Sequence, residues 1–135
     1  MTERETNLAH QALEEITGKM AKAARIADRK PSAITLVAVS KTRSGDEIRP
    51  LLEAGHRVFG ENRVQEAMDK WPALKADYPD IELHMVGQLQ SNKAAEAVAL
   101  FDYVHSLDRP SLLKALAREM DRQDRRIPCF VQVNI

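Results

Sequence analysis

Residues 34–40 read ITLVAVS and are followed at once by Lys41. The stretch is β-branched and almost entirely apolar, which is typical of a parallel strand that is buried on both faces. Lysine is rarely buried unless another group pairs with it. A strand of this kind therefore either ends at the protein surface or presents Lys41 at a site that uses its amine.

Strands and helices alternate along the rest of the chain. A first amphipathic helix is predicted over residues 3–29, and strands are predicted over residues 34–40, 57–62, 81–87, 102–108 and 129–135. Helices are predicted between consecutive strands, with apolar stripes formed by Val64, Met68, Trp71 and Leu74 in one and by Leu112, Leu113, Leu116 and Met120 in another. Strict alternation of this kind predicts a parallel sheet with helices outside it.

Two α/β architectures fit this pattern. One is an open doubly wound sheet, and the other is part of a (β/α)8 barrel. A complete barrel usually needs about 250 residues, so a chain of 135 residues supplies about half of one. No linker or low-complexity segment interrupts the sequence, and we expect residues 1–135 to form a single domain.

The composition narrows the class of protein. Hydrophobic residues make up 44% of the chain and charged residues 30%, which is typical of a soluble globular protein. Lys plus Arg and Asp plus Glu number 20 each, so we expect neither nucleic acid nor a membrane surface as the main partner. No apolar run approaches the roughly 20 residues that span a bilayer. Cys129 is the single cysteine, which excludes an intrachain disulfide and favours a reducing, cytoplasmic location.

Polar side chains follow the predicted strands at their C-terminal ends. Lys41, Asn62 and Asn134 fall at such ends, and His84 lies within the third strand. Alternation along the first strand places Val39 on the same face as Lys41. Because ligands of parallel α/β folds bind at this edge of the sheet, the residues predict a small-molecule site centred on Lys41.

Each of these residues also has a purely structural interpretation. Lys41 is compatible with a solvated loop, Asn62 with the N-cap of a helix, and His84 with a hydrogen-bonded core histidine. His56, His84 and His105 are scattered along the chain without the spacing of metal ligands, and no metal site is predicted.

Four stretches, in this order, resemble one protein family. They are VAVSKTRS at residues 37–44, FGENRVQEA at 59–67, HMVGQLQSNK at 84–93 and VQVNI at 131–135. Together they are similar to the pyridoxal 5′-phosphate (PLP) homeostasis proteins, the YggS-like group related to the N-terminal barrel of alanine racemase. The similarity runs over about residues 8–135, and the combination is far more specific than any single stretch.

The resemblance implies that the chain is the N-terminal portion of a PLP-binding (β/α)8 barrel, with about five strands after a leading helix. It implies that Lys41 holds PLP as an internal aldimine, a Schiff base, and that Asn62 lies near the cofactor ring. His84 and Asn134 match positions that line the same mouth, above an apolar floor that includes Val39. The implied function is intracellular PLP homeostasis, with PLP-dependent apoenzymes as recipients and no robust catalytic turnover.

The implied chemistry suits the end of an apolar strand. A Schiff base forms from a neutral amine, whereas a free lysine has a pKa of about 10.4. Because burial disfavours the ammonium form, we expect Lys41 to be buried above Val37 and Val39. The phosphate cradle and the ring-nitrogen arginine of the family belong to its second half, and no stretch of this sequence matches them.

Two other functions stay open. A racemase-like enzyme on the same barrel needs a second base, but Tyr78 and Tyr103, the two tyrosines, lie in no matching motif. Alternatively, the chain binds no cofactor and self-associates, because an incomplete barrel leaves unpaired edges at its first and fifth strands.

Overall fold

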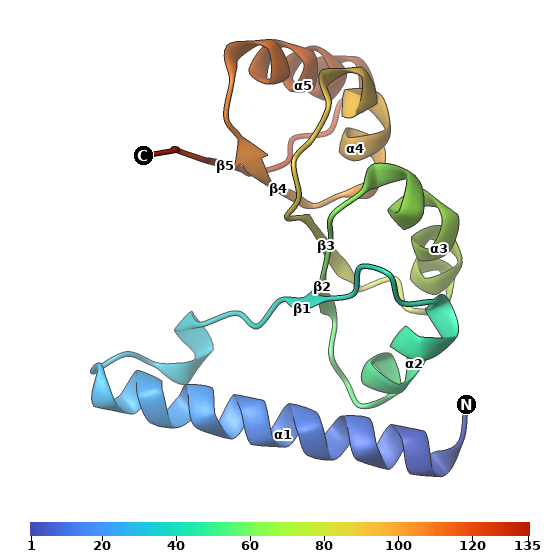
Figure 1. The fold of residues 1–135 in the computed structure, drawn as a ribbon, viewed down its shortest axis with the longest axis vertical. Coiled ribbons are helices and arrows are strands. Elements are labelled where there is room, and N and C mark those ends of the chain that lie inside the picture. The colour runs from blue at the N-terminus through green and yellow to red at the C-terminus, as the bar shows by residue number, and fades with distance from the viewer.

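The computed structural model describes residues 1–135 and contains one sheet of five parallel strands (Figure 1). The strands are β1 (Ala38–Val39), β2 (Val58–Glu61), β3 (Glu82–Met85), β4 (Tyr103–Leu107) and β5 (Cys129–Val131). They lie side by side in chain order, and every neighbouring pair is parallel. A doubly wound sheet would reverse its strand order, so this order identifies the fold as part of a (β/α)8 barrel.

Helices cover one face of the sheet. Along the chain they are α2 (Gly45–Glu53), α3 (Val64–Asp77), α4 (Ala94–Leu100) and α5 (Pro110–Gln123), with short 3-10 turns at Pro31–Ala33 and Ser91–Lys93. In Figure 1 the four helices stand on the same side of the strands, and each packs against the next. These helices leave the opposite face of the sheet uncovered. We call it the inner face, because it would line the interior of a closed barrel.

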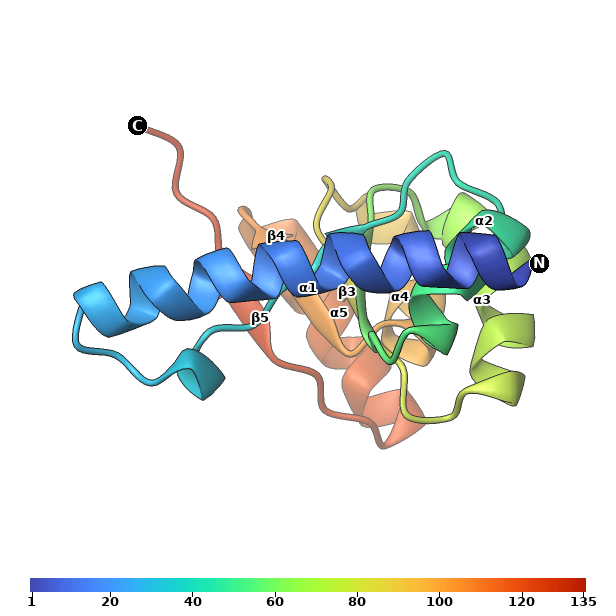
Figure 2. The same ribbon diagram turned by 90° about the horizontal axis from the view of Figure 1, so that it is seen from below.

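A long first helix, α1 (Glu3–Ile26), lies across the β1 end of the molecule and packs against α2 (Figures 1 and 2). It begins with a capping box, in which Thr2 Oγ1 accepts from the backbone N–H of Glu5 at 3.1 Å and Glu5 Oε2 accepts from that of Thr2 at 2.7 Å. Helix α2 begins in the same way at Ser44 and Glu47.

The hydrophobic core fills the space between the sheet and helices α2–α5. It consists of 20 buried residues, among them Phe59, Leu83, Met85 and Val104 from the strands. Trp71 of α3 is fully buried, with its ring centroid 5.0 Å from that of Phe59. Burying each large apolar side chain contributes roughly 1.5–3 kcal/mol, so the helix-covered side of the sheet stabilises the fold.

Two residues of the predicted apolar stripes lie outside this core. Met68 is 39% exposed and Leu113 is 54% exposed. In α3 the residues that are buried are Val64, Ala67, Trp71 and Leu74. One residue advances a helix by more than a quarter of a turn, so once Ala67 faces the sheet, Met68 turns toward the flank. The predictions for Met68 and Leu113 are wrong, and the other members of both stripes are confirmed.

The first strand differs most from its prediction. Regular strand structure covers only Ala38 and Val39 of the predicted residues 34–40, and Val39 is 53% exposed. The prediction of a strand buried on both faces is therefore wrong. Helices α2–α5 cover one face only, and β1 and β5 are the edges of the sheet, so an apolar strand at this position keeps one row of side chains uncovered.

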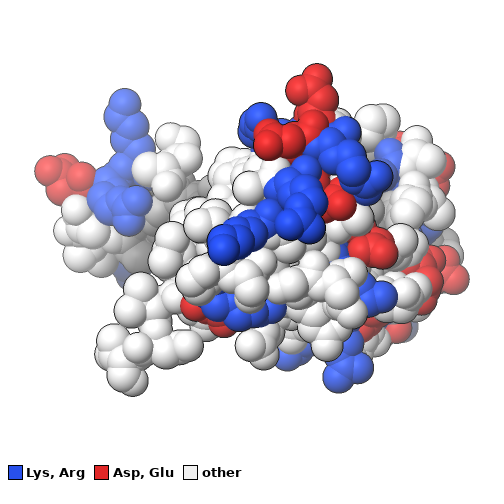
Figure 3. All heavy atoms as spheres, turned by 90° about the horizontal axis from the view of Figure 1, so that it is seen from above, with Lys and Arg blue, Asp and Glu red and all other residues white.

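Charged side chains of both signs share the surface. Figure 3 shows Lys and Arg beside Asp and Glu on the face seen from the upper end of Figure 1. Arg122 pairs with Glu119 and Arg126 pairs with Asp121, each at 2.7 Å. This face therefore does not carry charge of a single sign. None of the helices is both long enough and apolar enough to cross a membrane.

After β3 the chain passes very close to the end of β2. A Cβ atom at Gly87 would lie 2.4 Å from the carbonyl oxygen of Asn62 and 2.7 Å from its Cα. Such a contact is with backbone, which cannot swing aside as a flexible side chain can. The absence of a side chain at Gly87 thus lets the loop after β3 pack directly on the residue that follows β2.

Gly87→Ala is expected to lower the free energy of unfolding by about 1–3 kcal/mol, as overpacked sites do. The matched control is Gly18→Ala in α1, where a Cβ meets nothing within 4 Å and the higher helix propensity of alanine stabilises by up to about 1 kcal/mol. Urea denaturation measures the difference. Equal stability of the two variants would contradict the close contact between Gly87 and Asn62.

Candidate functional site

One row of four residues crosses the inner face of the sheet. Val39 pairs with Gly60, Gly60 with His84, and His84 with Tyr103. Because strand side chains alternate, the row points away from the core side, to which the neighbouring Phe59 belongs. The fold therefore places two predicted site residues, Val39 and His84, on one surface with a glycine between them.

Gly60 lets apolar groups meet in the middle of this row. A Cβ atom there would lie 3.0 Å from Val37 Cγ1, 3.3 Å from Val86 Cγ1 and 3.6 Å from Val39 Cγ2. The three valines thus converge over the glycine from both neighbouring strands. We call Val37, Val39 and Val86 the apolar floor.

Lys41 and Asn62 each follow the row by two residues, toward the C-terminal ends of β1 and β2. They therefore lie at the same edge of the sheet. Lys41 is exposed, and its amine makes no hydrogen bond or ion pair in the structure. The expected burial of Lys41 above the first strand is wrong, because the uncovered inner face leaves the amine in contact with solvent.

The two asparagines of the predicted site occupy different environments. Asn62 is half-buried and lines a cavity of about 630 Å³ at the C-terminal rim, together with Arg63, Lys93 and Arg109. The N-cap of α3 is Arg63, so the interpretation of Asn62 as a helix cap is wrong. Asn134 lies three residues beyond β5, exposed, in a terminal stretch that runs away from the sheet (Figure 1). Its role at the site stays a prediction.

A buried carboxylate lies directly behind this edge. Glu61, the last residue of β2, is on the core side and has no exposed surface. Its Oε2 accepts hydrogen bonds from Ser40 Oγ at 2.5 Å and from Trp71 Nε1 at 2.9 Å, and it pairs with Lys70 Nζ at 3.0 Å. The sequence pattern does not single out Glu61 or Lys70. One feature of the sequence could have identified Glu61. Side chains alternate along the strand that contains FGEN, so Glu61 points toward the core, where a charged group needs a partner.

The loop after β1 is bound to α3 by the same network. Lys70 Nζ donates to the backbone oxygens of Ser40 at 2.8 Å and Arg43 at 2.7 Å. Glu66, one turn earlier on α3, accepts a hydrogen bond from the backbone N–H of Thr42 at 2.5 Å. This hydrogen bond, with a further contribution from Lys70, holds the pKa of Glu66 below its usual value. Residues on both sides of Lys41 are thus anchored.

Aromatic rings gather toward the other end of the row. His84 stacks on Tyr103 with ring centroids 4.5 Å apart, and His105 lies 5.0 Å from His84 and 4.8 Å from Phe130. His84 Nδ1 and His105 Nε2 are 2.8 Å apart and share a hydrogen bond. Although these two histidines are far apart along the chain, the pairing of β3 with β4 brings them together. No three His, Cys, Asp or Glu side chains form a group that could hold a metal ion.

His84 combines burial with an unused nitrogen. The residue is 6% exposed, its Nε2 has no hydrogen-bond partner, and Glu82 Oε1 is 3.7 Å from that nitrogen. Burial lowers the pKa of His84, against a smaller opposing effect of Glu82, and burial also lowers the pKa of His105. The interpretation of His84 as a hydrogen-bonded core histidine therefore holds for Nδ1 alone, since Nε2 is buried without a hydrogen-bond partner.

These two histidines predict a loss of stability in mild acid. Their pKa values in the folded chain lie below the value of about 6.5 for unfolded histidine. As the pH falls through that value, the unfolded chain binds more protons than the folded chain, and folding becomes less favourable. We expect the urea midpoint to fall between about pH 7.5 and about pH 5.5.

His105→Gln is expected to reduce this pH dependence, because it removes one titrating ring and keeps a side chain that can hydrogen-bond to His84. His10→Gln is the matched control, since His10 is exposed on α1, outside the sheet. A pH dependence in His105→Gln as steep as in the unmodified chain would assign the effect to other groups.

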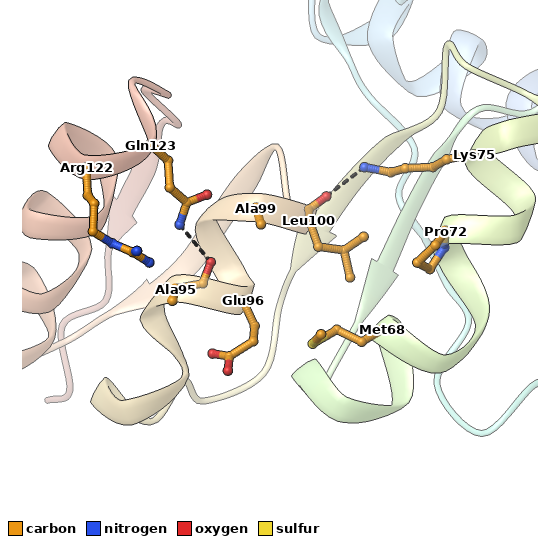
Figure 4. Close-up of a pocket in the computed structure, with 9 residues that line it drawn as sticks. All are labelled: Met68, Pro72, Lys75, Ala95, Glu96, Ala99, Leu100, Arg122 and Gln123. Carbon is orange, nitrogen blue, oxygen red and sulfur yellow. Dashed lines mark hydrogen bonds between the residues drawn. The ribbon is translucent and has the colours of Figure 1, made fainter.

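A second cavity, of about 610 Å³, lies on the helix side between α3, α4 and α5 (Figure 4). Two of its polar side chains are hydrogen-bonded to the backbone of α4. Lys75 Nζ donates to the backbone oxygen of Leu100 at 2.6 Å, and Gln123 Nε2 donates to that of Ala95 at 3.0 Å. All of its lining residues belong to helices, and none lies at a strand end. We therefore place the candidate site at the C-terminal edge of the sheet.

Sequence comparisons identify relatives of this chain. The model of the alanine racemase N-terminal domain family matches residues 12–135. The pyridoxal phosphate homeostasis protein of Escherichia coli (strain K12) is 37% identical over 133 residues, which cover 96% of this chain and 55% of that protein. The protein of the same name from Synechocystis sp. is 43% identical over 102 residues, covering 76% and 44%. The chain thus spans about half the length of the curated relatives it matches.

Solved structures share this fold over about half of their length. PipY of Synechococcus elongatus PCC7942, with PLP bound, matches with a TM-score of 0.74 at 40% identity and covers 86% of this chain and 54% of that one. An unknown protein from Bifidobacterium adolescentis matches with a TM-score of 0.85 at 26% identity, covering 96% of this chain and 56% of that one. The chain belongs to the alanine racemase N-terminal domain family and, within it, to the pyridoxal phosphate homeostasis proteins.

Proposed function

We propose that this chain binds pyridoxal 5′-phosphate and holds it covalently on Lys41, in a PLP homeostasis role. The observation that carries the proposal is the position of Lys41. Its unpartnered amine lies at the C-terminal edge of a parallel barrel sheet, where ligands of this fold bind. The structure of PipY with PLP bound, at 40% identity, supports the choice of ligand.

The residues around this edge suit a flat ring that carries polar groups. The apolar floor provides a surface for a ring, and Val39 within it is exposed. His84 offers a buried nitrogen without a partner, and Asn62 lines the adjacent rim. We propose that Lys41, Val39, Asn62 and His84 hold the cofactor, with Asn134 as a further contact.

The covalent step is a condensation. Pyridoxal phosphate supplies an aldehyde, and a primary amine condenses with an aldehyde to give a carbon–nitrogen double bond and one molecule of water. The attacking amine must be neutral, whereas Lys41 is exposed to solvent in this chain. The E. coli relative is about twice as long as this chain. We propose that the second half of such a protein closes the inner face, completes the desolvation of Lys41 and supplies the phosphate contacts.

Borohydride trapping tests the assignment of Lys41. After incubation with PLP and reduction, peptide mass spectrometry is expected to show a saturable adduct on Lys41, because specific binding raises the occupancy of one amine above the others. Lys41→Ala should abolish this adduct. Lys19→Ala, on the exposed surface of α1, is the matched control and should leave it unchanged. Adducts spread over lysines such as Lys19 and Lys75 would contradict the proposal.

The same samples test the two other functions. Interconversion of D- and L-alanine would indicate a racemase-like enzyme, and Tyr103, stacked on His84, is the tyrosine that lies on the inner face. Self-association without an adduct would indicate a chain that associates through the edges β1 and β5, where Val39 and Val131 are exposed.

A further inference from the structure

We propose that Lys70, through its ion pair with Glu61, is a positioning residue that sets the direction in which Lys41 leaves the sheet. The inference rests on the proposed function, in which Lys41 is the attachment point. It concerns residues 40–43, which we call the Lys41 loop. Lys70 lies on α3, outside the barrel edge, and is not expected to touch the cofactor.

Lys70 is surrounded by acceptors that come from three elements. Its Nζ donates to the backbone oxygens of Ser40 at 2.8 Å and Arg43 at 2.7 Å, the first and last residues of the Lys41 loop. The same nitrogen lies 3.0 Å from Glu61 Oε2 and 3.2 Å from Glu66 Oε1. Its side chain is 10% exposed. One ammonium group thus connects both ends of the loop to β2 and to α3.

Glu61 explains why this group must be a cation. Its carboxylate has no exposed surface, and Lys70 is its ion-pair partner. A buried carboxylate without a cation is strongly unfavourable, so Glu61 keeps the ammonium of Lys70 in place below the loop. Ser40 Oγ, at 2.5 Å from Glu61 Oε2, adds a direct bond from the residue before Lys41 to the same carboxylate.

The backbone of the loop needs such support. Thr42 has a φ of 65°, the left-handed region, which is an outlier for a β-branched residue. Conformations of this kind persist only where the surroundings hold them. Here the N–H of Thr42 donates to Glu66 Oε1 at 2.5 Å, while Lys70 binds the loop on either side.

The direction of Lys41 therefore depends on the loop and not on contacts of its own. Its side chain is exposed and makes no hydrogen bond or ion pair, so no polar contact of its own orients it, and its direction follows the backbone at Ser40 and Thr42. Reactions between positioned groups lose rate steeply when one group is displaced by about 1 Å. Releasing the loop should thus reduce condensation at Lys41 even in a chain that is folded.

The test compares trapping at Lys41 in five chains: the unmodified protein, Lys70→Met, Lys70→Arg, the double variant Glu61→Gln/Lys70→Met, and Lys75→Met. The double variant removes the buried charge together with its partner, so it keeps the test decisive if Lys70→Met alone fails to fold. Lys75→Met is the matched control, because Lys75 is also a partly buried lysine on α3 that donates to a backbone oxygen, that of Leu100.

We expect the borohydride-trapped fraction at Lys41 to fall about tenfold or more in Lys70→Met and in the double variant. Adducts on other lysines of the same sample should stay constant, and Lys75→Met should stay within about twofold of the unmodified chain. Urea denaturation identifies the variants that are folded. Lys70→Arg, which retains the charge and the donors, should restore part of the trapping at Lys41, a recovery that a purely structural defect elsewhere would not produce.

Two results overturn the inference in distinguishable ways. If a folded Lys70→Met or double variant traps PLP at Lys41 as well as the unmodified chain does, Lys70 does not position Lys41, and the proposed function stands. If the unmodified chain itself shows no specific adduct on Lys41, the proposed function fails and the inference falls with it.

Discussion

The geometry of the functional edge depends on the buried carboxylate of Glu61. A charge with no exposed surface is tolerated only when it is paired and hydrogen-bonded, and Glu61 is compensated by Lys70, Ser40 and Trp71. These partners come from the Lys41 loop and α3, so one carboxylate at the end of β2 connects the strand to both of them. Breaking such a pair typically costs about 3–5 kcal/mol, a large share of the stability of a small domain.

The two faces of the sheet have different roles. The helix-covered face holds the 20-residue core and stabilises the fold. The inner face carries the apolar floor, the stacked rings of His84 and Tyr103, and the unpartnered Nε2 of His84. Apolar and aromatic groups that lie together on an uncovered surface are typical of an interaction or ligand surface. The E. coli relative is about twice as long as this chain, which is the basis of the proposal that the rest of such a protein covers this face.

Local rules predicted the order of elements. The capping residue Ser44 marks a helix start, and apolar stripes mark the helices, because both depend on residues close together in the chain. The edge on which Lys41 and Asn62 lie also follows from local pattern, since parallel strands end on the same side. Met68 and Leu113 were mispredicted because apolar spacing alone does not fix the angle at which a helix meets a sheet.

The sequence by itself determined the family, through four motifs in order, and the alternation that makes a parallel barrel. Only the tertiary structure decided the environment of each site residue. It showed that Lys41 is solvated, that His84 and His105 share a hydrogen bond, and that Lys70 binds the backbone around Lys41. The physical reason is distance along the chain: these contacts join residues about 20 to 30 positions apart, so they exist only after the strands have paired.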